Sequence, residues 1–175
     1  MELLTGNEKK YEQFRERLQQ MGITIVKFKG YLPEIQATTL EAVTAAKAKA
    51  ASEIMGRACL VDDVGLFLQD YPGFPGPFTK YALRTLKAEG FKRLLRGTAN
   101  EALMVCIIGY WDGESLVLAR GEMKGTLNPE RNITNPLVPL NDWFIPLEGE
   151  QKMQHRANAL QKLAEILEIE KRRRG

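Results

Sequence analysis

The feature that most constrains the fold is the alternation of strand-like and helical segments in the first sixty residues. Strand-like "ELLT" leads through Gly6-Asn7 into a helical pattern, Glu8–Met21, with apolar residues at three- and four-residue intervals. A strand over 23–28, an alanine-rich helix over 39–55 and a strand over 58–61 follow. This order is typical of an α/β fold.

The second half of the chain predicts that the sheet is mixed. After the Gly/Pro-dense "YPGFPGPF", helical patterns cover 79–88 and 91–96, and two strands, 102–111 and 115–123, are joined by a "DGE" turn typical of an antiparallel hairpin. The stretch 128–148 is Pro/Asn-rich and predicts a long surface loop, with Trp143 and Phe144 as its large apolar anchors. A last helix is expected over 151–171.

Length and composition indicate a single domain spanning residues 1–175. The hydrophobic and charged fractions, 44% and 27%, are ordinary for a globular protein, and the longest apolar run, "LMVCIIGYW", is too short to span a bilayer. The N-terminus has no secretory pattern, so we expect a cytoplasmic protein. Cys59 and Cys106 lie in apolar runs without ligand spacing and are expected to be buried, reduced thiols.

The net charge of +3 does not by itself indicate a nucleic-acid partner. A basic run, Lys171 to Arg174, ends the chain. A solvated tail is the preferred interpretation of this run, and binding of nucleic acid through it is a weaker one.

Two adjacent carboxylates, Asp62 and Asp63, interrupt the apolar run "CLVDDVGLFL". Burying an ionised carboxylate without a partner is costly, so the pair should have something to bind. Neighbouring residues on a strand point to opposite faces, and we expect only one of the two to face a cleft. Mg²⁺ is often held by one or two carboxylates together with phosphates and water, and Glu34 in "YLPEIQ" is a further candidate ligand. Turn chemistry or a surface charge is the alternative for each acid.

The segment "TGNEKK" combines a strand end, a tight turn and a helix start. Backbone N–H groups and the positive end of the helix dipole favour an anionic phosphate there. Lys9 and Lys10 in the first helical turn are easier to understand beside such an anion, although a surface helix that begins with lysine is the simpler alternative.

Other candidate binding residues lie near two further helix starts. Lys80 follows the rigid "PGFPGPF" loop, for which a plain loop-to-helix connection is an equal alternative. His155, the single histidine, stands with Arg156 at the start of the last helix, where both could contact a base or a phosphate, or His155 could merely be exposed.

Six segments in this order resemble the inosine triphosphate pyrophosphatase family, also called the Ham1-like or XTP/dITP diphosphatases. They are "TGNEKK", "LPEIQ", "LVDDVGLFL", "GFPGPFTKY", "RGEMKG" and "HRANAL", and they run almost from end to end of the chain. The resemblance implies an elongated mixed sheet flanked by helices, two lobes around a cleft, and a homodimer. It also implies a Mg²⁺-dependent enzyme that hydrolyses noncanonical purine triphosphates such as ITP, dITP and XTP to a monophosphate and pyrophosphate.

The resemblance assigns roles to the candidate residues. Asp63 and Glu34 would bind the metal, Asp63 would also orient or deprotonate the attacking water, and Lys10 would be catalytic as well as phosphate-binding. The implied substrate-binding residues are Thr5, Gly6, Asn7, Lys10, Lys80, Trp143, Phe144, His155 and Arg156.

The chain departs from the family pattern at the end that would hold the base. Gln154 stands where the family has the serine of Ser-His-Arg, Glu150 stands where it has a lysine, and "PLND", Pro139 to Asp142, replaces Gly-Trp-Asp-Pro. The alternative function is therefore a diverged nucleotide-binding protein with altered base specificity or without catalysis.

Overall fold

The computed structural model describes residues 2–4, 8–20, 25–28, 32–33, 35–149 and 153–174. The strands are β1 (Glu2–Leu4), β2 (Val26–Phe28), β3 (Cys59–Leu68), β4 (Pro75–Gly76), β5 (Glu101–Trp111), β6 (Leu116–Leu127) and β7 (Phe144–Pro146). The helices are α1 (Glu8–Gln20), α2 (Leu40–Met55), α3 (Thr79–Leu94), α4 (Leu140–Trp143) and α5 (Gln154–Arg174).

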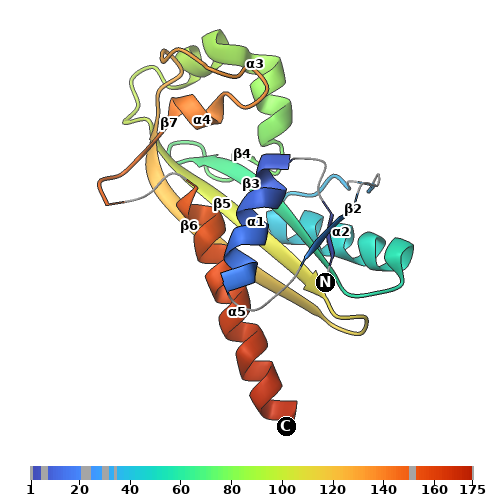
Figure 1. Cartoon of the computed structure of the whole chain (residues 1–175). Coiled ribbons are helices and arrows are strands. Elements are labelled where there is room, and N and C mark those ends of the chain that lie inside the picture. The colour runs from blue at the N-terminus through green and yellow to red at the C-terminus, as the bar shows by residue number, and fades with distance from the viewer. Residues whose placement is uncertain are drawn as a thin grey trace.

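The strands form one mixed sheet in the order β2-β1-β3-β5-β6-β7, with β4 paired to β3. β1 runs parallel to β2 and β3, and the remaining pairs are antiparallel. The long strands β3, β5 and β6 pair along most of their lengths and run through the whole molecule (Figure 1). The predicted mixed sheet flanked by helices is confirmed.

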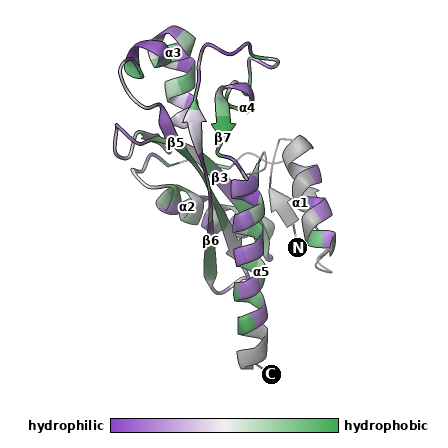
Figure 2. Ribbon diagram, turned by 90° about the vertical axis from the view of Figure 1, so that its left-hand side faces the viewer, coloured by the Kyte–Doolittle hydropathy of each residue, from purple (hydrophilic) through white to green (hydrophobic). Residues whose placement is uncertain are grey.

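Helices cover both faces of this sheet. On one face α1 and α5 pack against β3, β5 and β6 through a buried cluster that includes Phe14, Leu18 and Leu163. On the opposite face α2 covers β3 and β5 through Leu40, Ala48 and Ala51. The far end of the sheet is covered by α3 and α4 (Figure 1), around a separate cluster. Hydrophobic residues accordingly follow the central strands, while the helices alternate between hydrophobic and hydrophilic residues (Figure 2).

Several predicted elements differ in extent from the observed ones, and two differences bear on the site. The strand expected to end at Val61 continues to Leu68, so Asp62 and Asp63 lie inside β3 and not at its carboxyl end, because β5 pairs with β3 from Cys59 to Leu68. The two helices expected over 79–88 and 91–96 form one element, α3, which is kinked at Lys87, where φ is 52°.

The expected loop over 128–148 is only partly irregular. It contains α4 and β7, elements of four and three residues that are too short to produce a recognisable period. Trp143 and Phe144 are 3% and 6% exposed, so they anchor this stretch in the core as expected.

Cys59 and Cys106 are buried free thiols, as predicted. Burial raises the pKa of the Cys59 thiol to about 11, which keeps it protonated and unreactive at neutral pH. Among the described residues, none of the helices combines the length and apolar composition that crossing a bilayer requires.

Candidate active site

Along one edge, β3 pairs with other described strands at two separate places. On that edge β3 pairs with β1 at Cys59 and Leu60 and with β4 at Leu66 and Phe67. Within the described residues, the intervening positions 61–65 have no strand partner on this side. Asp62 and Asp63 both lie in this interval.

Asp63 points to the face covered by α2. Lys47 of α2 donates from Nζ to Asp63 Oδ1 at 2.8 Å, and Thr44 Oγ1 lies 3.5 Å from Asp63 Oδ2. The Lys47 and Asp63 side chains are 14% and 18% exposed, so the ion pair is shielded from solvent but remains reachable. Lys47 is a site residue that the sequence did not single out.

Asp62 points to the opposite face, towards the start of α5, as the strand geometry predicts. Its side chain is fully buried, and Arg156 Nε lies 3.8 Å from its Oδ2. This carboxylate therefore belongs to the α5 side of the site, where it faces the guanidinium of Arg156.

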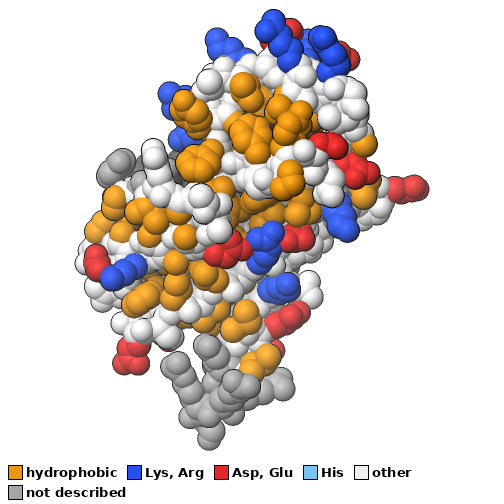
Figure 3. All heavy atoms as spheres, turned by 180° about the vertical axis from the view of Figure 1, so that it is seen from behind, with side chains coloured by type: hydrophobic (Ala, Val, Ile, Leu, Met, Phe, Trp, Pro, Cys, Tyr) orange, Lys and Arg blue, Asp and Glu red, His pale blue; other side chains and the backbone are white. Residues whose placement is uncertain are grey.

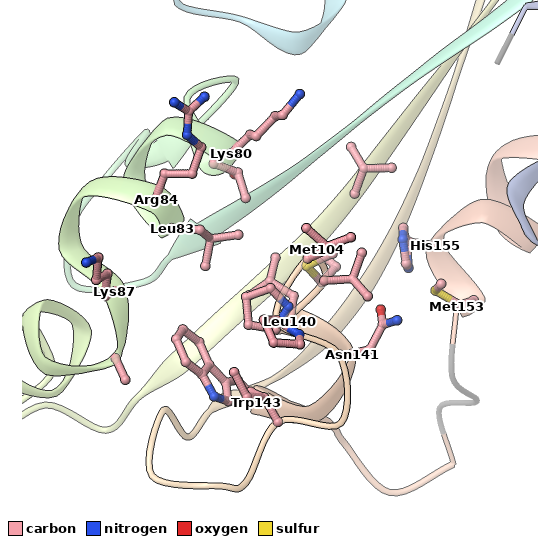
Figure 4. A pocket seen from close by; sticks show the side chains of 18 of the residues that line it. Lys80, Leu83, Arg84, Lys87, Met104, Leu140, Asn141, Trp143, Met153 and His155 are labelled. Carbon is pink, nitrogen blue, oxygen red and sulfur yellow. The ribbon is translucent and has the colours of Figure 1, made fainter. Parts of the chain in front are cut away.

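A cavity of about 720 Å³ opens on that same face, between α3, α4 and the start of α5 (Figure 4). It is predominantly apolar, with Leu83, Met104 and Leu140 among its lining residues. Four cationic side chains also line it, and none of its described lining residues is acidic. These cations are Lys80, Arg84, Lys87 and Arg156. A cavity of this size and charge suits an anionic ligand with an apolar or aromatic body.

Three polar side chains that line this cavity have buried nitrogen atoms without a hydrogen-bond partner in the described part of the structure. These atoms are Trp143 Nε1, both ring nitrogens of His155 and Arg156 Nε. Since buried polar groups are nearly always paired, these atoms are suited to contact a ligand with donors and acceptors of its own.

His155 is 1% exposed, and its pKa is lowered to about 3, chiefly by this burial and also by the charge of the nearby Arg156, while Asp62 acts in the opposite sense. The imidazole is therefore neutral at physiological pH and offers one N–H donor and one acceptor nitrogen. The interpretation of His155 as merely exposed is wrong.

The position of His155 depends on a close approach between α5 and β6. A Cβ atom at Gly121 would overlap the carbonyl oxygen of His155 and the amide nitrogen of Ala159. Only glycine lets the helix backbone pack directly on the strand here, which explains the first glycine of "RGEMKG". Met153, immediately before α5, has a φ of 66°, a conformation that non-glycine residues seldom adopt outside functional sites.

Lys80 is positioned by the residue before it. Thr79 is 6% exposed; its Oγ1 accepts a hydrogen bond from Leu66 N at 2.8 Å and donates one to Gly76 O at 2.6 Å. These bonds tie the start of α3 to β3 and β4, and so fix the backbone at Thr79 and Lys80, the two residues of "PGFPGPFTK" that line the cavity.

The structure thus brings together part of the predicted site. Lys80, Trp143, His155 and Arg156 surround the large cavity, while Phe144 lines a smaller neighbouring one. Asp63 lies with Lys47 across β3 and lines neither of these two cavities. Thr5, Gly6, Asn7 and Glu34 lie outside the described residues, as does the side chain of Lys10.

A divalent metal fits the chemistry at Asp63. The carboxylate supplies the hard oxygen donors that Mg²⁺ prefers, and it is partly accessible. The described residues contain no group of three or more potential metal-ligating side chains. Mg²⁺ commonly needs only one or two carboxylates when phosphates and water complete its shell, so this donor set is compatible with a metal shared with a substrate.

Comparison with known proteins places this geometry in context. Residues 1–166 match the model of the Ham1 family. A dITP/XTP pyrophosphatase of Methanopyrus kandleri is 33% identical, with 92% of each chain covered. One from Saccharolobus solfataricus is 32% identical over 95% of this chain and 92% of the relative. Among solved structures, the Ham1 protein of Staphylococcus aureus superposes with a TM-score of 0.74 at 20% identity, covering 97% of this chain and all of the other, which supports the fold.

Proposed function

Because the chain belongs to the Ham1 family, we propose that it hydrolyses noncanonical purine nucleoside triphosphates, such as ITP, dITP and XTP, to a monophosphate and pyrophosphate. The observation that carries this proposal is the lining of the large cavity. Its described lining residues are mostly apolar and include four cations and no carboxylate. They also include buried polar atoms that have no hydrogen-bond partner in the described part of the structure. That combination matches a purine attached to a chain of phosphates.

In this proposal the base occupies the large cavity and the triphosphate extends past the edge of β3 towards Asp63. Trp143, His155 and Arg156 would contact the base, and Lys80 would neutralise phosphate charge at the cavity mouth. Lys47 would meet the phosphates beside Asp63. Thr5, Gly6, Asn7 and Lys10 remain predicted phosphate-binding residues, on the sequence pattern and the family resemblance alone.

The reaction needs a water molecule aimed at the α-phosphorus. The water oxygen forms a bond to this phosphorus, the bond from it to the bridging α,β-oxygen breaks, and pyrophosphate leaves. Asp63 would orient the water and accept its proton, while Lys47 holds the carboxylate in place at 2.8 Å. Preorganised lysines would stabilise the charge that develops on the phosphate oxygens.

We also propose that Mg²⁺ is the cofactor. Asp63 and Glu34 would hold the ion, whose chemistry is to neutralise and align the phosphate oxygens. Removal of divalent metal with EDTA should abolish pyrophosphate release, and added Mg²⁺ should restore it.

The homodimer, the single domain over residues 1–175 and the cytoplasmic location remain predictions. Hydrophobic side chains gather on the face shown in Figure 3, and Phe74, Phe78 and Tyr81 near the start of α3 are exposed large apolar residues. Such exposed apolar groups support an interaction surface. Nucleic-acid binding stays a weaker idea, since Lys171 to Arg174 end α5 and do not form a separate tail.

The decisive experiment measures pyrophosphate release from ITP, dITP and XTP beside ATP, GTP, CTP and UTP, with Mg²⁺. We expect the deaminated purines to be preferred, and Asp63→Asn to lower kcat by about 10²- to 10⁴-fold while nucleotide binding persists. Asp70→Asn, the same change at an exposed turn, is the matched control. Absence of pyrophosphate from every triphosphate would refute the proposal, and nucleotide binding without turnover would support the diverged binding protein instead.

A further inference from the structure

A second cavity of about 250 Å³ adjoins the large one. Its lining residues are Met104, Met123, Thr134, Leu140, Asn141, Asp142, Phe144, Pro146, Met153 and His155. Five of them, Met104, Leu140, Asn141, Met153 and His155, also line the large cavity. Figure 4 labels these five side chains, which lie near one another between the sheet, α4 and the start of α5.

The sizes of the two cavities suggest different occupants. Ligand sites usually measure about 300 to 1,000 Å³, a range that includes the large cavity and excludes the small one. The small cavity is therefore better suited to part of a ligand whose main body lies next door than to a ligand of its own.

The walls of the small cavity favour a substituent with an apolar body. Met123, Phe144 and Pro146 provide apolar surface, and Thr134 and Asp142 form a polar rim. Thr134 donates to Asp142 Oδ2 from both its backbone N, at 2.7 Å, and its Oγ1, at 2.9 Å, which fixes this rim.

The boundary between the cavities carries the polar groups that could hold the ring itself. His155 is 1% exposed, and within the described residues neither of its ring nitrogens has a hydrogen-bond partner. Asn141, which also lines both cavities, adds an amide that can donate and accept. A flat heterocycle with donors and acceptors on its edge would satisfy these groups at the boundary.

Leu140 lines both cavities, so its side chain forms part of the boundary between them.

We infer that the small cavity is an annex of the base site, and that the enzyme accepts purine triphosphates with an enlarged substituent at position 2 or 6 of the base. The substituent lies in the annex while the purine occupies the large cavity. This inference rests on the proposed function and extends its substrate class.

The test compares N6-benzyl-ATP with ATP and N2-benzyl-GTP with GTP, with ITP as the reference substrate. For at least one pair, we expect kcat/KM of the benzylated substrate to equal or exceed that of its parent. The measured quantity is the ratio of kcat/KM for the benzylated substrate to kcat/KM for its parent. Met123 and Thr134 line the annex but not the large cavity. Met123→Trp and Thr134→Trp should each lower this ratio at least about tenfold, because the indole fills the annex. Any general loss of activity cancels in the ratio.

Two further measurements keep the result interpretable. Met55→Trp, on α2, changes the same residue type at a position that lines neither cavity and should leave the ratio unaltered. If Met123→Trp does not fold, Thr134→Trp decides the matter from the exposed rim.

The inference is overturned if the wild-type protein turns over ITP but neither benzylated substrate above about a hundredth of its parent, or if filling the annex leaves the ratio unchanged. If ITP, dITP and XTP also yield no pyrophosphate, the proposed function fails and the annex has no substrate to serve.

Discussion

At the scale of single residues, the site depends on two neighbouring acids that serve opposite faces of one strand. Asp63 pairs with Lys47 of α2, and Asp62 faces Arg156 of α5. The sequence predicted this division from strand geometry. It could not predict Lys47, because Lys47 and Lys49 look alike in an alanine-rich helix until the sheet shows which one faces Asp63.

Lys47→Met should lower kcat/KM for ITP by about 10²-fold, because it removes a cation from the phosphates and a partner from Asp63. Lys47→Arg keeps the charge but not the geometry of the ammonium and should retain more activity. Steady-state kinetics of pyrophosphate release measure both variants. A Lys47→Met enzyme within twofold of the wild type would show that the ion pair has no part in the reaction.

His155 should make the protein less stable in mild acid. Its pKa in the folded protein is about 3 and its ordinary value is 6.5, so between these values the unfolded chain binds the extra proton. Stability should therefore fall as pH drops below 6.5, by up to about 1.4 kcal/mol per pH unit from this group.

Urea unfolding of the wild type and of His155→Gln at several pH values between 4.5 and 7.5 measures this contribution. The free energy of unfolding of the variant should fall less steeply as pH drops below 6.5. The carboxylates titrate in both proteins, so their contribution cancels in the difference between the two. Identical acid slopes would mean that His155 is not buried in its neutral form.

At the scale of elements, the cavity depends on short connections that hold longer elements in place. Thr79, the first residue of α3, hydrogen-bonds to Leu66 of β3 and Gly76 of β4, immediately before Lys80. The sequence indicated a rigid loop ahead of a helix. It could not show that a threonine hydroxyl fixes the loop, since Leu66 and Gly76 become its partners only through the pairing of β3 with β4.

Thr79→Val should destabilise the protein by about 1–3 kcal/mol, because a buried N–H and a buried carbonyl lose their partner. It should also raise KM for ITP several-fold with a smaller change in kcat, since Lys80 would be held less firmly. Thr79→Ser restores the hydroxyl and should restore both quantities. Thermal unfolding and steady-state kinetics measure the two effects, and a stability loss with unaltered KM would leave Thr79 a purely structural role.

At the scale of the whole molecule, the sequence predicted the order of strands and helices well because each long element has its own periodicity. It failed where tertiary pairing overrides local signals. β3 continues through Asp62 and Asp63 because β5 pairs with it residue by residue, and α4 and β7 are too short to have a period. The residue patterns alone did not predict the cavity, and a cleft was expected only from the family resemblance, because the cavity walls come largely from α3, the stretch 133–143 and α5, which only the fold brings together.

A nucleotide that contacts these distant elements at once should stabilise the folded chain as a unit. An ITP analogue with an uncleavable α,β-linkage, at about 100 times its Kd with Mg²⁺, should add about 2.7 kcal/mol and raise Tm by roughly 5–10 °C. Inosine would reach only the cavity, and pyrophosphate only the groups around Asp63. At the same concentration as the analogue, either ligand alone should therefore raise Tm less, as measured by thermal unfolding. If inosine matched the analogue, the phosphates would contribute nothing, and Asp63 and Lys47 would not belong to the binding site.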